Sequence, residues 1–313
     1  MTNRTNTNLA KLDLAKPDLA DLKRLIARHA PADGIHDTAI PALSLIRSSA
    51  ISDPVHTLYE PSLCIVAAGR KRARIGSREI VYEAGDCLVV GIDLPIIGAV
   101  IEASPDDPYL CLKLGLDRGM LADLLLETSA AGRTPHVPDG MEAAGIQAAT
   151  RDLVDASARL VGLLDTPQHI SVLGPLVVRE IHYRLITGPQ GAILRQIASG
   201  ESRLAQVGRA VAYLCENYAA PFRIEDLARI AGMSPSSFHA HFRMATAMSP
   251  LQFRTRLRMH EARRLMVAEG LTAAEAGFRV GYDSPSQFSR DHVRIYNRPP
   301  RRDLSRMQSE QAY

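Results

Sequence analysis

The sequence predicts an α+β protein in two parts: a small β-barrel or sandwich with helices after it, and an all-α C-terminal domain. Short β-branched runs separated by glycines occupy residues 60–116. Apolar residues then recur every three or four positions between about 119 and 187, and again from residue 201 onward. With 313 residues, 46% of them hydrophobic, the chain is long enough for about two domains with hydrophobic cores.

The strand pattern is clearest in "YLCLKLGL", residues 109–116. Its four leucines alternate with other residues, so we expect them to form a buried face, with Tyr109, Cys111 and Lys113 pointing the other way. The pattern suits a small sandwich or barrel with a cavity.

The helices between 119 and 187 carry more apolar surface than one small barrel needs. They can cover the barrel, form a dimer interface, or do both, and the sequence leaves these choices open.

Residues 222–247 read as a helix-turn-helix, in which a glycine ends the first helix and Ser234 caps the second. Residues 272–297 repeat the arrangement. Here Gly281 supplies the turn conformation that is costly for other residues, and Ser284 caps a helix that begins with a proline. The C-terminal domain therefore contains two copies of one unit.

A single linker helix joins the two units, beginning at its cap Ser249 and ending at Gly270. About 19 residues at about 1.5 Å each give a rod of about 28 Å. That length can hold two recognition helices close to one DNA turn, about 34 Å, apart on one face of a duplex.

The charge distribution also distinguishes the two parts. Residues 201–313 contain 17 arginines, no lysine and 11 acidic residues, a net charge of +6, whereas residues 1–200 have a net charge of −3. A basic C-terminal region is the electrostatic pattern expected of a surface that binds nucleic acid.

The outward positions near the start of each recognition helix are the expected DNA contacts. Arg290 can bond guanine through two hydrogen bonds, and Gln287 can bond adenine. Arg294 and Arg298 follow the recognition positions and are expected to neutralise phosphate. The complete set of expected DNA-binding residues is Ser236, Ser237, His239, Ser286, Gln287, Arg290, Arg294 and Arg298.

Several stretches resemble the AraC/XylS family of bacterial transcription regulators. They are "IEDLARIAGMSPSSFHAHF", "MSPLQFRTRLRMHEARRLM" and "VGYDSPSQFSRDHVRIYNRPPRRDL", and upstream "PVHTLYEPSLCIVAAG" and "REIHYRLITGPQG". The upstream stretches resemble the subgroup with an N-terminal cupin-like domain. The resemblance implies a cupin-like regulatory domain over 1–190 and a DNA-binding domain over 201–313. At Ala240, His292, Val293 and Asn297 the chain departs from the family pattern.

The partners that the resemblance implies are promoter or operator DNA, an unidentified small-molecule effector, a second copy of the chain in a homodimer, and RNA polymerase. The sign of regulation stays open. The candidates for the effector pocket are His56, Tyr59, Cys64 and Cys111.

Two alternatives remain for the N-terminal domain. A cysteine thiolate could make it a sensor of oxidants or aldehydes, or the domain could be a cupin enzyme with a DNA-binding appendage. His56 lacks the His-x-His partner that a metal cupin needs, so we expect no metal, no other cofactor and no enzymatic activity.

No apolar run reaches the roughly 18 residues that would span a bilayer, and the polar start of the chain lacks an apolar signal core. The sequence thus predicts a cytoplasmic protein that does not engage a membrane.

Overall fold

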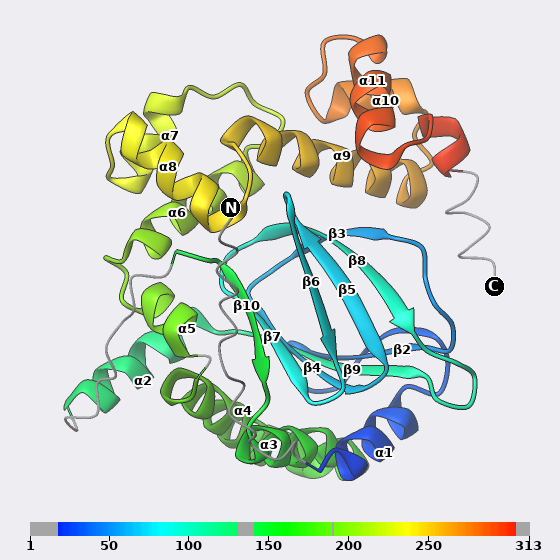
Figure 1. The fold of residues 1–313 in the computed structure, drawn as a ribbon, viewed down its shortest axis with the longest axis vertical. Helices are drawn as coiled ribbons and strands as arrows, with labels where there is room; N and C mark the ends of the chain where they lie inside the picture. The colour runs from blue at the N-terminus through cyan, green and yellow to red at the C-terminus, as the bar shows by residue number, and fades with distance from the viewer. Residues whose placement is uncertain (1–17, 131–140, 190, 305–313) are drawn as a thin grey trace, which may run out of the picture.

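The computed structural model describes residues 18–130, 141–189 and 191–304, and it shows two antiparallel β-sheets packed face to face, with helices on two sides (Figure 1). The larger sheet has the strand order β1-β2-β9-β4-β7-β10, and the smaller sheet has the order β3-β8-β5-β6. The strands of the larger sheet are β1 (Gly34–Asp37), β2 (Leu43–Ser48), β4 (Ser62–Ala68), β7 (Asp86–Val90), β9 (Tyr109–Gly115) and β10 (Ala144–Ala148). Those of the smaller sheet are β3 (Val55–Tyr59), β5 (Arg70–Ile75), β6 (Arg78–Glu83) and β8 (Leu94–Glu102).

Helices surround this barrel-like core, which agrees with the predicted α+β class. The first group consists of α1 (Ala20–His29), α2 (Arg118–Ala130), α3 (Arg151–Gly162), α4 (Ile170–Thr187) and α5 (Gly191–Ala198). In this group α1 is in close contact with strands of the larger sheet, β2, β4 and β9, and the other helices pack on one another and on α1. The C-terminal helices are α6 (Arg203–Glu216), α7 (Ile224–Ala231), α8 (Pro235–Thr246), α9 (Pro250–Ala268), α10 (Ala273–Arg279) and α11 (Pro285–Tyr296).

The strands expected within 60–116 are present, but the sheet is larger than the sequence predicted. Strands β1, β2 and β3 precede the predicted region, and β10 interrupts the stretch 119–187 that we expected to be helical. The sequence of β10, "AGIQA", has no alternating pattern of its own. It is a strand because it pairs with β7 along the open edge of the larger sheet.

Strand β9 alternates as predicted, but side chains on both of its faces are buried. It lies between β2 and β4, and α1 packs against it from outside. The leucines of the strand are buried as predicted, but Tyr109 and Cys111 on the opposite face are equally buried, at 0% and 1% exposed. That second face is not solvated, because it faces the smaller sheet across the interior.

Both helix-turn-helix units have the predicted caps. Ser234 accepts a hydrogen bond from the Ser237 amide, and Ser284 accepts one from the Gln287 amide. Gly232 and Gly281 hold the left-handed conformation at the turns, with φ of 67° and 89°. The pairs α7–α8 and α10–α11 are therefore two copies of one motif.

The linker helix α9 has 19 residues, and a capping box formed by Ser249 and Gln252 starts it. It packs against β3 and β8, so the helix that joins the two helix-turn-helix units also rests on the smaller sheet (Figure 1). The tip of the β5–β6 hairpin touches the end of α8. A Cβ atom on Gly76 at this tip would lie 2.2 Å from the carbonyl oxygen of Ala247, so only glycine fits there.

None of the helices in the described part of the chain is long and apolar enough to cross a membrane.

Candidate functional site

The recognition helix of the first unit is α8, whose exposed side carries Ser236, His239 and Ala240 opposite the buried Phe238 and Phe242. The exposed groups lie at the start of the helix, as direct readout in a major groove requires.

Ser237, also an expected contact, is half-buried, and its hydroxyl lies 3.1 Å from Nδ1 of His241. Part of its hydrogen-bonding capacity is thus already used within the helix.

The recognition helix of the second unit is α11, and its exposed side carries longer hydrogen-bonding side chains than that of α8. Ser286, Gln287 and Arg290 are exposed on the side away from the buried Phe288. No hydrogen-bond or ion-pair partner for the Arg290 guanidinium occurs among the described residues. An extended cation with unused donors at this position suits a bidentate contact with guanine.

The two arginines beyond Arg290 are placed differently. Arg294 is exposed and pairs with Asp291, one turn earlier in α11, at 2.8 Å. Arg298 is exposed just after the helix, and its carbonyl oxygen accepts a hydrogen bond from Nδ1 of His292 at 2.9 Å. Both positions suit contacts with a phosphate backbone that passes the end of the helix.

The departures from the family pattern in α11 are accommodated by the packing. His292 is fully buried, and its ring contacts the rings of Phe288 and Tyr296 at centroid distances of 5.8 and 4.6 Å. Asn297 has φ of 56°, the left-handed conformation that asparagine tolerates better than most residues. The helix keeps its core and its C-terminal turn despite these substitutions. Val293 is exposed where the family often has a basic residue.

Inside the N-terminal domain, Tyr59, Cys64 and Cys111 meet between the two sheets around Lys71, which the sequence analysis did not select. The Lys71 ammonium donates a hydrogen bond to the Tyr59 hydroxyl at 3.1 Å and lies 5.8 Å from the centre of the Tyr109 ring. A signal was present in the sequence: Lys71 alternates with Ala73 and Ile75 on β5, so it occupies the inward phase of a strand.

A second lysine, Lys113 on β9, points into the same interior and lies 5.9 Å from the centre of the Tyr59 ring. Neither Lys71 nor Lys113 has a carboxylate within 4 Å among the residues that the structure describes. Burial disfavours the Lys71 charge, yet the attraction of Tyr59 and Cys111 outweighs it, and the pKa of Lys71 is raised.

The two thiols of this cluster have opposite character. The two thiols interact with each other, and this interaction lowers the pKa of Cys111 and raises that of Cys64. The two lysines further favour the thiolate of Cys111. We name Tyr59, Cys64, Lys71, Cys111 and Lys113 the inter-sheet cluster. Over the described ranges, no group of three or more His, Cys, Asp or Glu residues could hold a metal ion.

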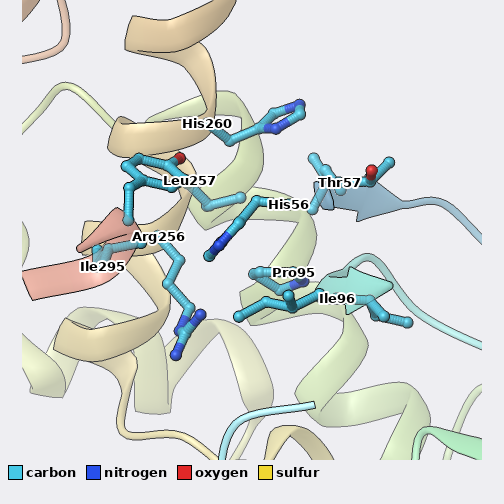
Figure 2. Close-up of a pocket in the computed structure, with 11 residues that line it drawn as sticks. His56, Thr57, Pro95, Ile96, Arg256, Leu257, His260 and Ile295 are labelled. Carbon is cyan, nitrogen blue, oxygen red and sulfur yellow. The ribbon is translucent and has the colours of Figure 1, made fainter. Parts of the chain in front are cut away.

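His56 does not belong to the inter-sheet cluster. It lies on β3 and faces the C-terminal domain, in a pocket between the smaller sheet, α9 and the end of α11 (Figure 2). Its ring contacts that of Tyr296 edge-on at 4.5 Å. Burial, followed by repulsion from Arg263, Arg256 and Arg74, lowers the pKa of His56 to about 3, so the ring is neutral. His56 is thus a contact between the domains.

Two helix-turn-helix units at the ends of one rigid helix, each with an exposed polar recognition face on a basic domain, define a DNA-binding protein. Residues 39–193 match the family model for the AraC-type transcriptional regulator N-terminus, and residues 227–306 match that for a helix-turn-helix domain. The chain belongs to the AraC/XylS family of transcription regulators.

Individual relatives are distant. The chain is 23% identical to the raffinose operon transcriptional regulatory protein RafR of Pediococcus pentosaceus. The aligned region has 223 residues, which are 70% of this chain and 75% of RafR. Two structures of ToxT from Vibrio cholerae share the fold. The form with an unsaturated fatty acid bound has a TM-score of 0.52 at 9% identity, covering 84% of this chain and 93% of ToxT. The form bound to (E)-4-(8-methylnaphthalen-1-yl)but-3-enoic acid has a TM-score of 0.55 at 10% identity, covering 84% and 97%.

The neutral His56 ring makes stability depend on pH. The unfolded chain binds a proton at His56 as the pH falls below 6.5, whereas the folded chain does so only near 3. This contribution to stability is therefore complete above 6.5 and is lost as the pH falls, by about 2 kcal/mol at about pH 5. His56→Phe keeps a ring against Tyr296 but cannot titrate.

We expect the free energy of unfolding, measured in urea at pH 7.5 and about pH 5, to fall less in His56→Phe than in the parent. Other histidines, including His182 and His260, also have pKa values lowered by burial. Their contribution to the pH dependence is the same in both proteins, so the difference between the proteins reports on His56. Equal losses in the two proteins would contradict the placement of a neutral His56 at the interface.

Proposed function

We propose that this AraC-type regulator reads two successive major-groove segments with α8 and α11, and that a small anionic molecule bound at the inter-sheet cluster controls that binding. The observation that carries the first part is the exposed polar face on each recognition helix, with Arg290 and its unused donors on α11. The 19 residues of α9 make a rod of about 28 Å, close to the length of one turn of DNA, which supports this mode of binding. We keep 1–190 and 201–313 as the proposed regulatory and DNA-binding domains.

Selection of bound duplexes from a random pool, at two salt concentrations, tests the two-site mode. We expect a motif with two parts about one helical turn apart, and an affinity that falls as salt rises. Enrichment of a single short motif would show that only one unit reads bases.

Arg290 and Arg294 should have different roles on the selected site. Arg290→Ala should cost about 1–3 kcal/mol of binding free energy and relax the preference at one base, because a bidentate base contact is lost. Arg294→Ala should weaken binding to all sequences by a similar factor, because phosphate carries no sequence information. Fluorescence anisotropy on the selected duplex and its single-base variants measures both. A sequence-selective loss in Arg294→Ala, or a uniform loss in Arg290→Ala, would reverse these assignments.

The effector site is proposed from the electrostatics of the interior. Two ammonium groups without a carboxylate partner face the same interior, and an anionic ligand placed there would form ion pairs with both. The ToxT structures, of the same fold, hold an unsaturated fatty acid and a synthetic butenoic acid. A carboxylate at Lys71 and Lys113 would therefore complete the site in the present chain.

Lys71→Met tests the effector site because it removes the buried charge and keeps a side chain of similar length. With oleate as the probe fatty acid, we expect a rise in the thermal midpoint of the parent that is lost in Lys71→Met. Lys23→Met is the control, since Lys23 is an exposed residue paired with Asp107. An oleate shift of the same size in Lys71→Met and the parent would exclude Lys71 from the site.

We propose that the chain forms a homodimer through α4. The sequence left open whether the helices of this region cover the barrel, form a dimer interface, or do both. The outer side of α4 exposes Val172, Leu173, Leu176 and Tyr183, at 67%, 42%, 60% and 37%. Leucines and valines in a stripe on one helix face are typical of an interface rather than of a solvated helix. RNA polymerase as a further partner and the cytoplasm as the location stay proposals that follow from the regulatory role.

Leu176→Arg should therefore yield monomers, because a charge on the stripe cannot be buried against a second copy. Molar mass from light scattering at micromolar concentration measures this, with Leu126→Arg on α2, also exposed, as the control. A monomeric parent protein would contradict the dimer proposal.

The cysteine pair supports a second candidate function, a thiol-based sensor. Cys64 and Cys111 lie on neighbouring strands, where Cys64 is the register partner of Lys113 and Cys111 that of Val66, so they are diagonal neighbours. An oxidant such as hydrogen peroxide could accept two electrons as a disulfide forms. If Cys64→Ser and Cys111→Ser variants keep the parent's DNA affinity and its response to peroxide, this function is excluded.

A further inference from the structure

A second cleft lies between the domains, separate from the His56 pocket, with a volume of about 580 Å³. Four arginines line it, and they come from four different elements: Arg74 from β5, Arg243 from α8, Arg256 from α9 and Arg294 from α11. Ser77 at the hairpin tip and Asn297 after α11 add neutral polar groups.

The cleft concentrates positive charge. No acidic residue lines it. Arg294 pairs with Asp291, but no ion pair of Arg74, Arg243 or Arg256 is found among the residues described by the structure. Burial, and then repulsion by Arg74 and Arg294, lowers the pKa of Arg256. Four guanidinium groups held together in this way form a site for an anion.

The position of the cleft indicates which anion. Arg243 lies one turn after His239 on the exposed side of α8, and Arg294 lies one turn after Arg290 on that of α11. The cleft therefore opens between the two recognition helices, with α9 behind it. When two such helices occupy successive major grooves, the sugar-phosphate backbone between the grooves passes between them.

We propose that this cleft binds the backbone phosphates of the DNA segment between the two half-sites, and that Arg74 of the N-terminal domain makes one of the contacts. The inference rests on the proposed two-site mode of DNA binding. It makes the β5–β6 hairpin part of the DNA interface rather than a neighbour of it. A shift of the hairpin relative to α8 would then change the affinity for DNA without blocking access to the recognition helices.

Arg74→Ala tests this contact, with Arg72→Ala as the matched control. Both arginines are exposed on the same face of β5, and both changes remove one positive charge. Arg72 lies nearest Glu79, at 3.5 Å, and does not line the cleft. The probe is a duplex of about 30 base pairs of arbitrary sequence, long enough for both units, because phosphate contacts do not depend on sequence.

One phosphate contact fewer reduces the salt slope of log affinity by about 0.9. We expect Arg74→Ala to bind about eightfold more weakly than the parent in about 0.1 M salt and about threefold more weakly in about 0.3 M, by fluorescence anisotropy. Arg72→Ala should follow the parent at both concentrations. A third variant, Arg243→Ala, should lose affinity with the same salt dependence as Arg74→Ala.

Three results would overturn the proposal. Equal affinities of Arg74→Ala, Arg72→Ala and the parent would show that DNA does not reach the hairpin. Tighter binding by Arg74→Ala would show that the hairpin hinders DNA. Unchanged DNA affinity together with loss of thermal stabilisation by pyrophosphate would assign the cleft to a small free anion. Failure of the two-site mode is a separate outcome, because it appears as loss of the two-part motif in the parent itself.

Discussion

The packing of α9 on the β3–β8 side of the smaller sheet is the contact on which the rest of the arrangement depends. One helix spaces the two DNA-reading units and is at the same time the surface on which the regulatory domain rests. Leu257 of α9 is buried, at 3% exposed, and it lines the same pocket as the neutral ring of His56. A change in the smaller sheet therefore acts on the element that sets the spacing of the recognition helices.

A chain of ring contacts leads from this interface into the second recognition helix. His56 contacts Tyr296, Tyr296 contacts His292, and His292 contacts Phe288, with centroid distances of 4.5, 4.6 and 5.8 Å. These ring contacts connect β3 with the second recognition helix. The first unit meets the N-terminal domain at Gly76 and Ala247, and the Ala143 amide donates a hydrogen bond to the Ala245 carbonyl oxygen at 3.3 Å.

Two groups of basic side chains mark the two anion sites that we propose. The inter-sheet lysines are enclosed, which suits a small ligand, whereas the arginine cleft is open between the recognition helices, which suits a polymer. The β5 strand links the two, since Lys71 points inward and Arg74 outward on the same six residues.

The sequence by itself determined the C-terminal domain almost completely, because its signals are local. Caps such as Ser234 and Ser284, the turn at Gly281 and the periodicity of the helices depend on neighbours within a few residues. The N-terminal domain was determined only in class. Tertiary structure decided four of its features: the strand β10, the burial of both faces of β9, the separation of His56 from the other pocket candidates, and the place of Lys71 in the inter-sheet cluster. Each depends on pairing or packing between segments far apart in the chain, and no local pattern encodes such contacts.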